Sequence, residues 1–324
     1  MDAAWRATTH RRASRHARSD LLNPSSTHAS RAVIALAVLS IIWGYNWVVM
    51  KEAGSYAGPF VFAALRTVFG ALSLFIVLLW RRQPMRLVAS GWTFLLGFLQ
   101  TAGFTGLSQW ALVVGATGKT AVLAYTMPFW ILLLAWPLLH ERLRGSQWLA
   151  VSIAFGGLIL VLEPWRSQAS LASELLAVSS GLAWAASAIV AKKMRARFQV
   201  DLLSLTAWQM LFGAIVLVIV ALVVPAPPMM VNVYLIGAVV YTAILGTGLA
   251  WLLWLYVLDT LPAGIAGMGS LAVPAIGVLA AWIQLGERPR AAELVGMLAI
   301  AVALVLLAMA GSRRADGLPQ DTPS

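Results

Sequence analysis

The sequence predicts an all-α membrane protein with ten transmembrane helices, arranged as two inverted five-helix repeats. Hydrophobic residues make up 60% of the 324 residues and charged residues only 11%, whereas about 25% of the residues in an average soluble domain are charged. Ten apolar segments each approach the roughly 20 residues that cross a bilayer. The fourth and ninth segments share one motif, which indicates an internal duplication.

Short connectors with turn-forming residues, such as Gly58-Pro59, separate the ten apolar segments. The segments are expected at 31–50, 59–80, 90–113, 118–139, 146–163, 172–191, 202–224, 231–256, 262–285 and 292–311. They form a first repeat over 31–165 and a second over 170–311, between a basic N-terminal tail over 1–30 and a C-terminal tail over 312–324. The Arg- and Ser-rich tail over 1–30 fits a disordered cytosolic tail, which we expect, but also a presequence or residues upstream of the true start codon.

The duplication is clearest in PFWILLLAWPLLHER, residues 128–142, and PAIGVLAAWIQLGER, residues 274–288. At an offset of 146 the two copies share a proline, a tryptophan and a final Glu-Arg pair: Pro128 and Pro274, Trp136 and Trp282, Glu141-Arg142 and Glu287-Arg288. Phe69-Gly70 and Phe212-Gly213 align at an offset of 143. A unit of five spans inserts its second copy in the opposite sense, and such inverted repeats place a substrate site near the middle of the bilayer.

The basic residues predict the orientation of the chain. If the N-terminus is cytoplasmic, the inner connectors and tails hold seventeen Lys and Arg residues and the outer connectors hold five. This asymmetry follows the positive-inside rule and predicts two cytoplasmic termini. It also accounts for most of the net charge of +11, so the expected partners are the lipid bilayer and a small-molecule substrate, with no nucleic acid.

The composition argues against several kinds of chemistry. The chain has no cysteine, and three of its four histidines, all but His140, lie in the N-terminal tail. We therefore expect no metal site, no cofactor and no catalytic cluster. Gly118-Lys119-Thr120 ends like a phosphate-binding loop, but Val113 occupies the position of the required first glycine. Direct use of ATP is not expected.

Three motifs carry a family resemblance: Trp43-Gly44 followed by Lys51, Leu65-Arg66 in the second segment, and a proline thirteen residues before Glu-Arg in both halves. With these motifs the chain resembles the EamA-type transporters of the drug/metabolite transporter superfamily. The resemblance implies a five-plus-five inverted repeat in the plasma membrane, the inner membrane of a bacterium, and transport of small polar metabolites. In the family that the chain resembles, this transport is often the export of amino acids or related compounds. Gln209, near the counterpart of Arg66, departs from the pattern.

Arg66 is the sharpest functional candidate. A lone cation inside a span costs about 2.5–3.5 kcal/mol on insertion scales, so its side chain should face the protein interior or water. It contacts an anionic group of the substrate, or it has a structural role and extends toward the membrane surface near Pro59. Both interpretations stay open at the level of sequence.

Polar and aromatic residues inside other segments complete the candidate pathway. We predict a substrate pathway lined by Trp43, Asn46, Arg66, Trp184, Ser187, Gln209, Thr247, Trp251 and Ser270. Single hydroxyl groups in membrane spans more often form hydrogen bonds between helices than contacts with a ligand. Pro128 and Pro274 each remove a backbone hydrogen bond and are candidate helix breaks or hinges. Glu141, Arg142, Glu287 and Arg288 are expected to be structural caps and ties at the ends of their segments.

Two functional hypotheses follow. The first is a secondary transporter, an exporter of small metabolites such as amino acids or related polar and amphiphilic compounds, working by alternating access. The alternative is a membrane-embedded transferase acting on lipid-linked or acyl substrates, which requires general bases or metal ligands at the membrane interface. A transporter moves a labelled solute across a liposome membrane unchanged, whereas an enzyme converts it.

Overall fold

The computed structural model describes residues 26–139, 145–162, 168–260 and 272–315, and every regular element in these ranges is a helix. The first half contains α2 (Ser26–Ala53), α3 (Pro59–Trp80), α4 (Ser90–Gly97), η1 (Phe98–Gly103), α5 (Phe104–Val114), α6 (Thr117–Ala124), α7 (Met127–Leu139) and α8 (Gly145–Leu162). The second half contains α9 (Gln168–Arg197), α10 (Leu202–Val223), α11 (Val233–Val240), η2 (Tyr241–Leu249), α12 (Ala250–Thr260), α14 (Ala272–Leu285) and α15 (Ala291–Ala315).

Six helical segments of the described chain are long and apolar enough to cross a membrane, and three shorter apolar helices accompany them. The six cover Arg31–Ala53, Pro59–Trp80, Thr117–Leu138, Leu171–Arg197, Leu202–Val223 and Val233–Val257. Helices satisfy their own backbone hydrogen bonds, as a lipid environment requires. Large apolar side chains such as Ile76, Leu79 and Leu222 are exposed on the outside of the bundle. The chain is a multi-pass membrane protein.

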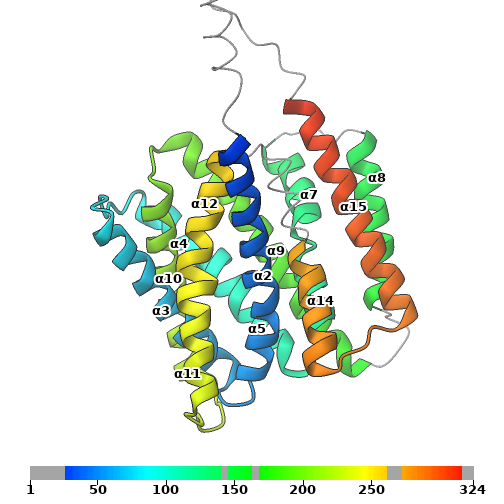
Figure 1. The fold of residues 1–324 in the computed structure, drawn as a ribbon, viewed down its shortest axis with the longest axis horizontal. Helices are drawn as coiled ribbons and strands as arrows, with labels where there is room; N and C mark the ends of the chain where they lie inside the picture. Colours follow the sequence, from blue (N-terminus) through cyan, green and yellow to red (C-terminus); the bar gives the residue numbers. More distant parts are fainter. Residues whose placement is uncertain (1–25, 140–144, 163–167, 261–271, 316–324) are drawn as a thin grey trace, which may run out of the picture.

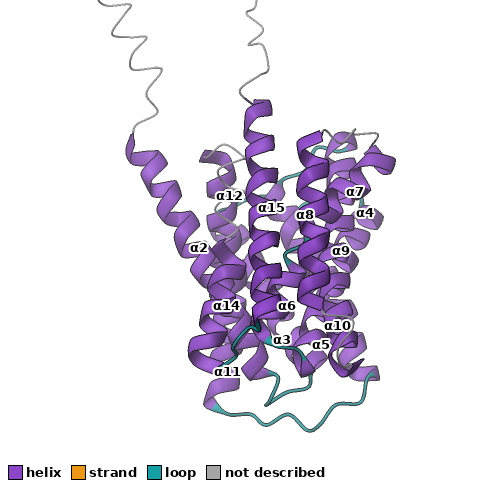
Figure 2. Ribbon diagram, turned by 90° about the vertical axis from the view of Figure 1, so that its right-hand side faces the viewer, coloured by secondary structure: helices purple, strands orange, loops and turns teal. Residues whose placement is uncertain are grey.

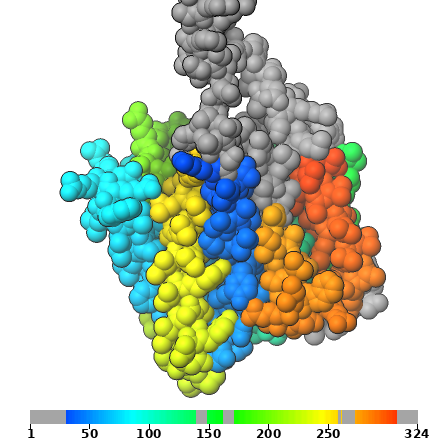
Figure 3. Space-filling view, in the orientation of Figure 1, coloured from blue at the N-terminus to red at the C-terminus, as the bar shows by residue number. Residues whose placement is uncertain are grey.

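The helices form one bundle in which α2 begins and α15 ends at the same end (Figure 1). We call this the terminal end, and the opposite end, where α11 begins and α14 finishes, the distal end (Figure 1). The side view shows α2 leaning away from α15 toward the terminal end (Figure 2). On the face shown in Figure 3, α2 lies directly against α11 and α12.

Packing joins helices from the two halves of the chain. The closest partners are α8 with α15 and α3 with α10. Leu74 and Leu78 of α3 are fully buried against Leu203 and Ala207 of α10. Because lipid chains are as apolar as these side chains, close packing rather than the hydrophobic effect stabilises such contacts.

Two spans contain π-helical turns. The helix from Ser90 to Val114 is π-helical over Phe98–Gly103, and the helix from Val233 to Thr260 is π-helical over Tyr241–Leu249. In a π-helical turn each N–H bonds to the carbonyl five residues earlier instead of four, and such turns frequently mark functional sites. Both turns lie in the middle of their spans.

The two candidate prolines lie in the first turns of helices. The α6 helix ends at Ala124 and α7 begins at Met127, so Pro128 is the second residue after a break in the span. Pro274 is the third residue of α14. Gly181 of α9 packs so closely on the break that an added Cβ would lie 2.6 Å from the Ala124 oxygen. The interruption is therefore held by a neighbouring helix, as broken membrane helices require.

The crossing of α8 and α15 tests the importance of close packing. A Cβ at Gly157 would lie 2.8 Å from the carbonyl oxygen of Gly296, whereas a Cβ at the adjacent Gly156 would meet nothing within 4 Å. We expect Gly157→Ala to destabilise the protein by about 1–3 kcal/mol because the helices must move apart. Gly156→Ala should leave stability unchanged or slightly raised, since alanine favours the helix. Thermal unfolding of both variants in detergent, followed by circular dichroism, checks this, and equal melting temperatures would contradict it.

Candidate functional site

A cavity of about 200 Å³ lies between the two halves of the bundle. The elements α2, α3, α9, α10 and α12, the break between α6 and α7, and both π-helical turns contribute to its wall. Seven of the nine predicted pathway residues line it: Trp43, Asn46, Arg66, Trp184, Gln209, Thr247 and Trp251. Residues that are far apart in the sequence therefore meet in one polar and aromatic chamber.

Of the other two predicted pathway residues, Ser187 does not line this cavity, and Ser270 lies outside the described residues. Ser187 is buried, and its hydroxyl donates to the carbonyl oxygen of Trp184, 2.6 Å away. That hydrogen bond is local to α9, so Ser187 adds no polar group to the chamber.

Arg66 points into the cavity from α3 and contacts α2. Its Nη1 lies 2.7 Å from the sulfur of Met50, and the Nδ2 atom of Asn46 lies 3.1 Å from the same sulfur. Asn46 and Met50 are one helical turn apart on α2, so both side chains share a face. Two N–H donors thus converge on a thioether, which is a weak acceptor.

Aromatic rings surround this polar centre. The Trp43 ring lies 6.2 Å from Trp251 and 6.1 Å from Trp254, and its Nε1 donates to the carbonyl oxygen of Gly246 at 3.0 Å. On another wall, Trp184 packs edge-on against Phe104 with ring centroids 4.9 Å apart. Pairs of this geometry are favourable beyond their buried area. They give the cavity firm apolar walls.

The π-helical turns bring backbone and hydroxyl groups to the cavity. Gln100 and Thr101 come from η1, and Gly246 and Thr247 come from η2. The Thr101 hydroxyl lies 2.8 Å from Oε1 of Gln209, which links η1 to α10. The irregular turns thus supply polar groups at mid-span, where a regular helix keeps its carbonyls bonded to itself.

Several lining residues were not among the predicted pathway residues. Apolar or aromatic side chains in apolar segments resemble core or lipid-facing positions, so their composition carried no signal. Hydroxyls that bond to their own backbone, as Thr67 does to Ala63, are equally inconspicuous. The additional lining residues include Trp47, Thr67, Gln100, Phe104, Tyr125, Met127, Met210 and Gly246.

Comparison with known proteins assigns the family. The EamA-like transporter family matches residues 30–163 and again residues 171–309. The chain belongs to the EamA-like transporter family. This EamA-family chain is 24% identical over 290 residues to the "Uncharacterized transporter YoaV" of Bacillus subtilis, covering 88% of the chain and 99% of that protein.

A second relative has a more specific name. The chain is 24% identical over 289 residues to the "Probable amino-acid metabolite efflux pump" of Escherichia coli, covering 85% of the chain and 93% of that protein. A solved crystal structure with 18% sequence identity matches with a TM-score of 0.63, covering 88% of this chain and 99% of that one. At this identity the structural likeness shows a shared fold.

At the distal end of this EamA-family transporter, a carboxylate joins the two halves. Glu287 accepts hydrogen bonds from the backbone N–H of Thr117 at 2.5 Å, from the Thr117 hydroxyl at 3.0 Å and from the N–H of Gly118 at 3.3 Å. The first N–H groups of a helix have no partner within the helix and carry partial positive charge. Glu287 therefore caps α6 from the other half of the chain. Glu141 and Arg142 lie outside the described residues, and Arg288 is exposed.

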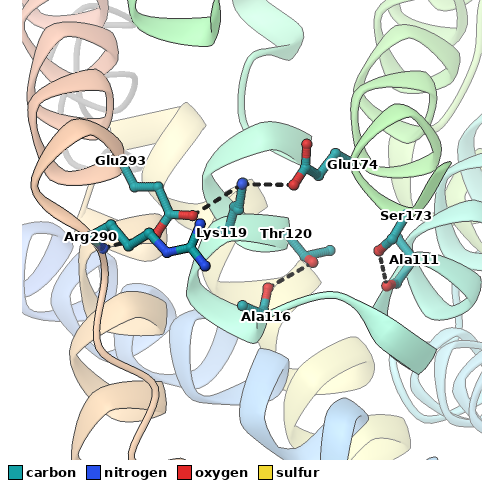
Figure 4. A network of polar contacts seen from close by, with 8 residues as sticks. All are labelled: Ala111, Ala116, Lys119, Thr120, Ser173, Glu174, Arg290 and Glu293. Atoms are coloured by element: carbon teal, nitrogen blue, oxygen red, sulfur yellow. Dashed lines mark hydrogen bonds and ion pairs between the residues drawn. The ribbon is translucent and has the colours of Figure 1, made fainter. Parts of the chain in front are cut away.

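An ion-pair network lies beside this cap (Figure 4). Lys119 of α6 lies 2.7 Å from Oε1 of Glu174 on α9 and 3.1 Å from Oε1 of Glu293 on α15 (Figure 4). The Glu174 side chain is only 5% exposed. A buried carboxylate of this kind requires a cation beside it. Lys119 thus ties α6 to two helices of the second half.

Two further sets of hydrogen bonds join helices at the distal end. The Nζ atom of Lys51 at the end of α2 lies 2.6 Å from the carbonyl oxygen of Leu112 and 3.0 Å from that of Gly115. These carbonyls belong to the C-terminus of α5, where a cation is favourable. The hydroxyl of Ser173 donates to the carbonyl oxygen of Ala111 at 2.5 Å (Figure 4). These contacts join α2 and α9 to the C-terminal part of α5.

The cap on α6 can be tested by substitution. We expect Glu287→Ala to lower stability by about 1–2 kcal/mol, because the N–H groups of Thr117 and Gly118 lose their acceptor. Glu287→Gln keeps an acceptor without the charge and should have an intermediate effect. The adjacent exposed Arg288→Ala should change stability by less than about 0.5 kcal/mol. Thermal unfolding in detergent measures all three, and equal losses for Glu287→Ala and Arg288→Ala would refute the capping role.

Proposed function

We propose that this EamA-family protein is a secondary transporter that exports small metabolites, amino acids or related polar and amphiphilic compounds, by alternating access. The observation that carries the proposal is the cavity between the halves, which combines a guanidinium, side-chain amides and indole rings at mid-span. Such a mixed wall suits a substrate with one charged end and an apolar body. The name of the Escherichia coli relative points to the same class of compound.

The proposed architecture is ten spans in two inverted five-helix repeats, over 31–165 and 170–311. The spans are α2, α3, α4–η1–α5, α6–α7 and α8 in the first repeat, and α9, α10, α11–η2–α12, α14 with the preceding residues, and α15 in the second. The π-helical turns begin at Phe98 and Tyr241. This offset of 143 equals the one between Phe69-Gly70 and Phe212-Gly213, which supports the duplication.

The packing partners support the same architecture. In the two repeats α2 corresponds to α9, and α14 corresponds to α6–α7. The contact of α2 with α14 therefore has its counterpart in the contact of α9 with α6 and α7. In the same way, the contact of α5 with α9 corresponds to that of α12 with α2, and the contact of α3 with η2 corresponds to that of α10 with η1. Each of the pairs α3 with α10 and α8 with α15 is its own counterpart. A two-fold relation between the repeats predicts this pattern.

Alternating access requires the ties at one end of the cavity to break while those at the other end form. The Glu287 cap and the Lys119 ion pairs join the two halves at the distal end. We place the distal end outside the cell and the terminal end in the cytoplasm, in the plasma membrane or bacterial inner membrane. In this arrangement the distal ties form the outer gate and separate when substrate leaves. Pro128 and Pro274 are the proposed hinges.

Transport of labelled solutes by purified protein in liposomes tests the proposed function. We expect an uptake that saturates with solute concentration for at least one compound in a panel of amino acids and their derivatives, with the solute recovered unchanged. Chemical conversion of the solute would favour a membrane-embedded transferase instead. For a transported carboxylate, Arg66→Met should lower kcat/KM by at least tenfold, because the anion loses its charged partner.

Two control variants accompany this measurement. Arg81→Met removes an exposed arginine just after the end of the same helix, and Ser187→Ala removes a hydroxyl that bonds within α9. Both should keep kcat/KM within about twofold of the unmodified protein, since neither residue lines the cavity. An Arg66→Met variant as active as these controls would eliminate the proposed anion contact.

The proposed orientation has its own test. The test uses a reporter domain that is active only in the cytoplasm. It should be active both when fused before residue 26 and when fused after residue 315, since α2 begins and α15 ends at one end of the bundle (Figure 1). Cysteines introduced one at a time at the exposed positions Arg288 and Arg81 should label from outside and inside, respectively. Labelling of both positions from the same side would refute the orientation.

A further inference from the structure

The cavity holds two N–H donors that share a poor acceptor. Arg66 and Asn46 both direct an N–H group at the sulfur of Met50, at 2.7 Å and 3.1 Å. Hydrogen bonds to a thioether are weak, and a guanidinium inside a span calls for a strong or anionic acceptor. A carboxylate oxygen accepts from a guanidinium and from an amide at the same time, with stronger bonds than a thioether sulfur forms. The place beside Met50 therefore suits a carboxylate.

The charge of the cavity wall limits the second end of the substrate. Arg66 is the only Lys, Arg, Asp or Glu among the residues that line the cavity in the described chain. A zwitterionic amino acid would place its ammonium group a few ångströms from this guanidinium, with no protein carboxylate beside it. A like charge at that distance, away from bulk water, opposes binding. The wall therefore favours an occupant with a net charge of −1.

A buried acceptor on Asn46 indicates what replaces the ammonium group. Asn46 is 8% exposed, and its Oδ1 atom has no hydrogen-bond partner in the described chain. A buried polar atom of this kind gains free energy when a donor reaches it. An ammonium group needs about three acceptors, whereas a secondary amide has a single N–H. One free oxygen beside a carboxylate position matches the amide N–H next to a carboxylate.

The remaining wall suits an apolar body. Trp43, Trp251 and Trp254 form one aromatic group and Trp184 with Phe104 forms another. The two groups flank a chamber of about 200 Å³. Resting on the transport function proposed above, we infer that the preferred substrates are N-acylated amino acids with a large apolar or aromatic side chain, carried as monoanions. Their carboxylate binds Arg66 and Asn46, their amide N–H donates to Asn46, and their side chain packs between the indoles.

Four labelled compounds separate these contributions in liposomes containing the full-length protein. N-acetyl-L-phenylalanine has all three features, and L-phenylalanine carries an ammonium group in place of the amide. 3-Phenylpropanoate has no N–H, and N-acetyl-L-phenylalaninamide has no carboxylate. We expect kcat/KM for N-acetyl-L-phenylalanine to exceed that for L-phenylalanine by at least tenfold. 3-Phenylpropanoate should fall between them, and the uncharged amide should not be transported above protein-free liposomes.

Variants of Asn46 test the proposed amide contact. Asn46→Leu should lower transport of N-acetyl-L-phenylalanine by at least fivefold more than transport of 3-phenylpropanoate, which has no N–H to lose. A loss of folded protein would lower both rates equally, so their ratio reports the contact itself. Asn46→Asp adds a carboxylate beside the substrate nitrogen and should shift the preference toward L-phenylalanine. An unchanged ratio in Asn46→Leu would overturn the amide contact.

The outcomes also separate this inference from the function on which it rests. If L-phenylalanine is transported as well as its N-acetyl derivative or better, the protein is a transporter but the inferred substrate class is wrong. If none of the four compounds moves above the protein-free background, the inference is refuted. If the wider panel of amino acids and derivatives also gives no transport, the proposed function is refuted with it.

Discussion

One positive charge in the middle of the bundle constrains this protein more than any other group. Arg66 lies on a membrane-spanning helix, where an arginine without water or a strong acceptor is costly. The neighbouring helices accommodate it by leaving a cavity at its side chain, lined by aromatic rings and other polar groups. The close approach of α3 to η2, with a Gly70 Cβ position only 3.0 Å from Thr247, holds Arg66 in place. The cavity thus gives this guanidinium a partly polar surrounding inside the bundle.

Irregular helices provide part of the polar surface of this cavity. A regular membrane helix exposes only side chains, because its backbone groups bond to each other. Here two π-helical turns and the break before α7 all lie beside the cavity. Each irregularity is supported by a neighbour, as Gly181 supports the break at Ala124. The cavity wall therefore combines backbone groups, hydroxyls and side-chain amides.

Charged side chains form the contacts between helices at the distal end, whereas aromatic rings form many of the contacts around the cavity. Glu287 and Lys119 join helices of opposite halves through short, charged contacts. Aromatic packing around Trp43 instead gives the cavity an apolar wall, since edge-on and offset ring pairs are favourable. The described contacts between the halves are therefore charged at the distal end and largely aromatic around the cavity.

Composition and periodicity determined a large part of this picture. Apolar runs predict membrane helices because hydrocarbon requires every backbone group to be paired within the chain, and they placed α3 and α10 within a few residues of their observed bounds. Seven of nine pathway candidates line one cavity, because a polar side chain in a membrane span is costly in lipid and therefore faces the interior of the protein. Glu287 was expected to be a cap, although its partner was not.

Other features were decided by the tertiary structure alone. The π-helical turns, the sulfur of Met50 shared by Arg66 and Asn46, and the cap on α6 by a residue 170 positions away depend on contacts between distant segments. Apolar cavity residues such as Trp47 and Met210 look like ordinary core residues in the sequence. Local sequence specifies which groups cannot face lipid, but the packing of whole helices selects the partner that each group finds, since that choice depends on the surrounding helices together.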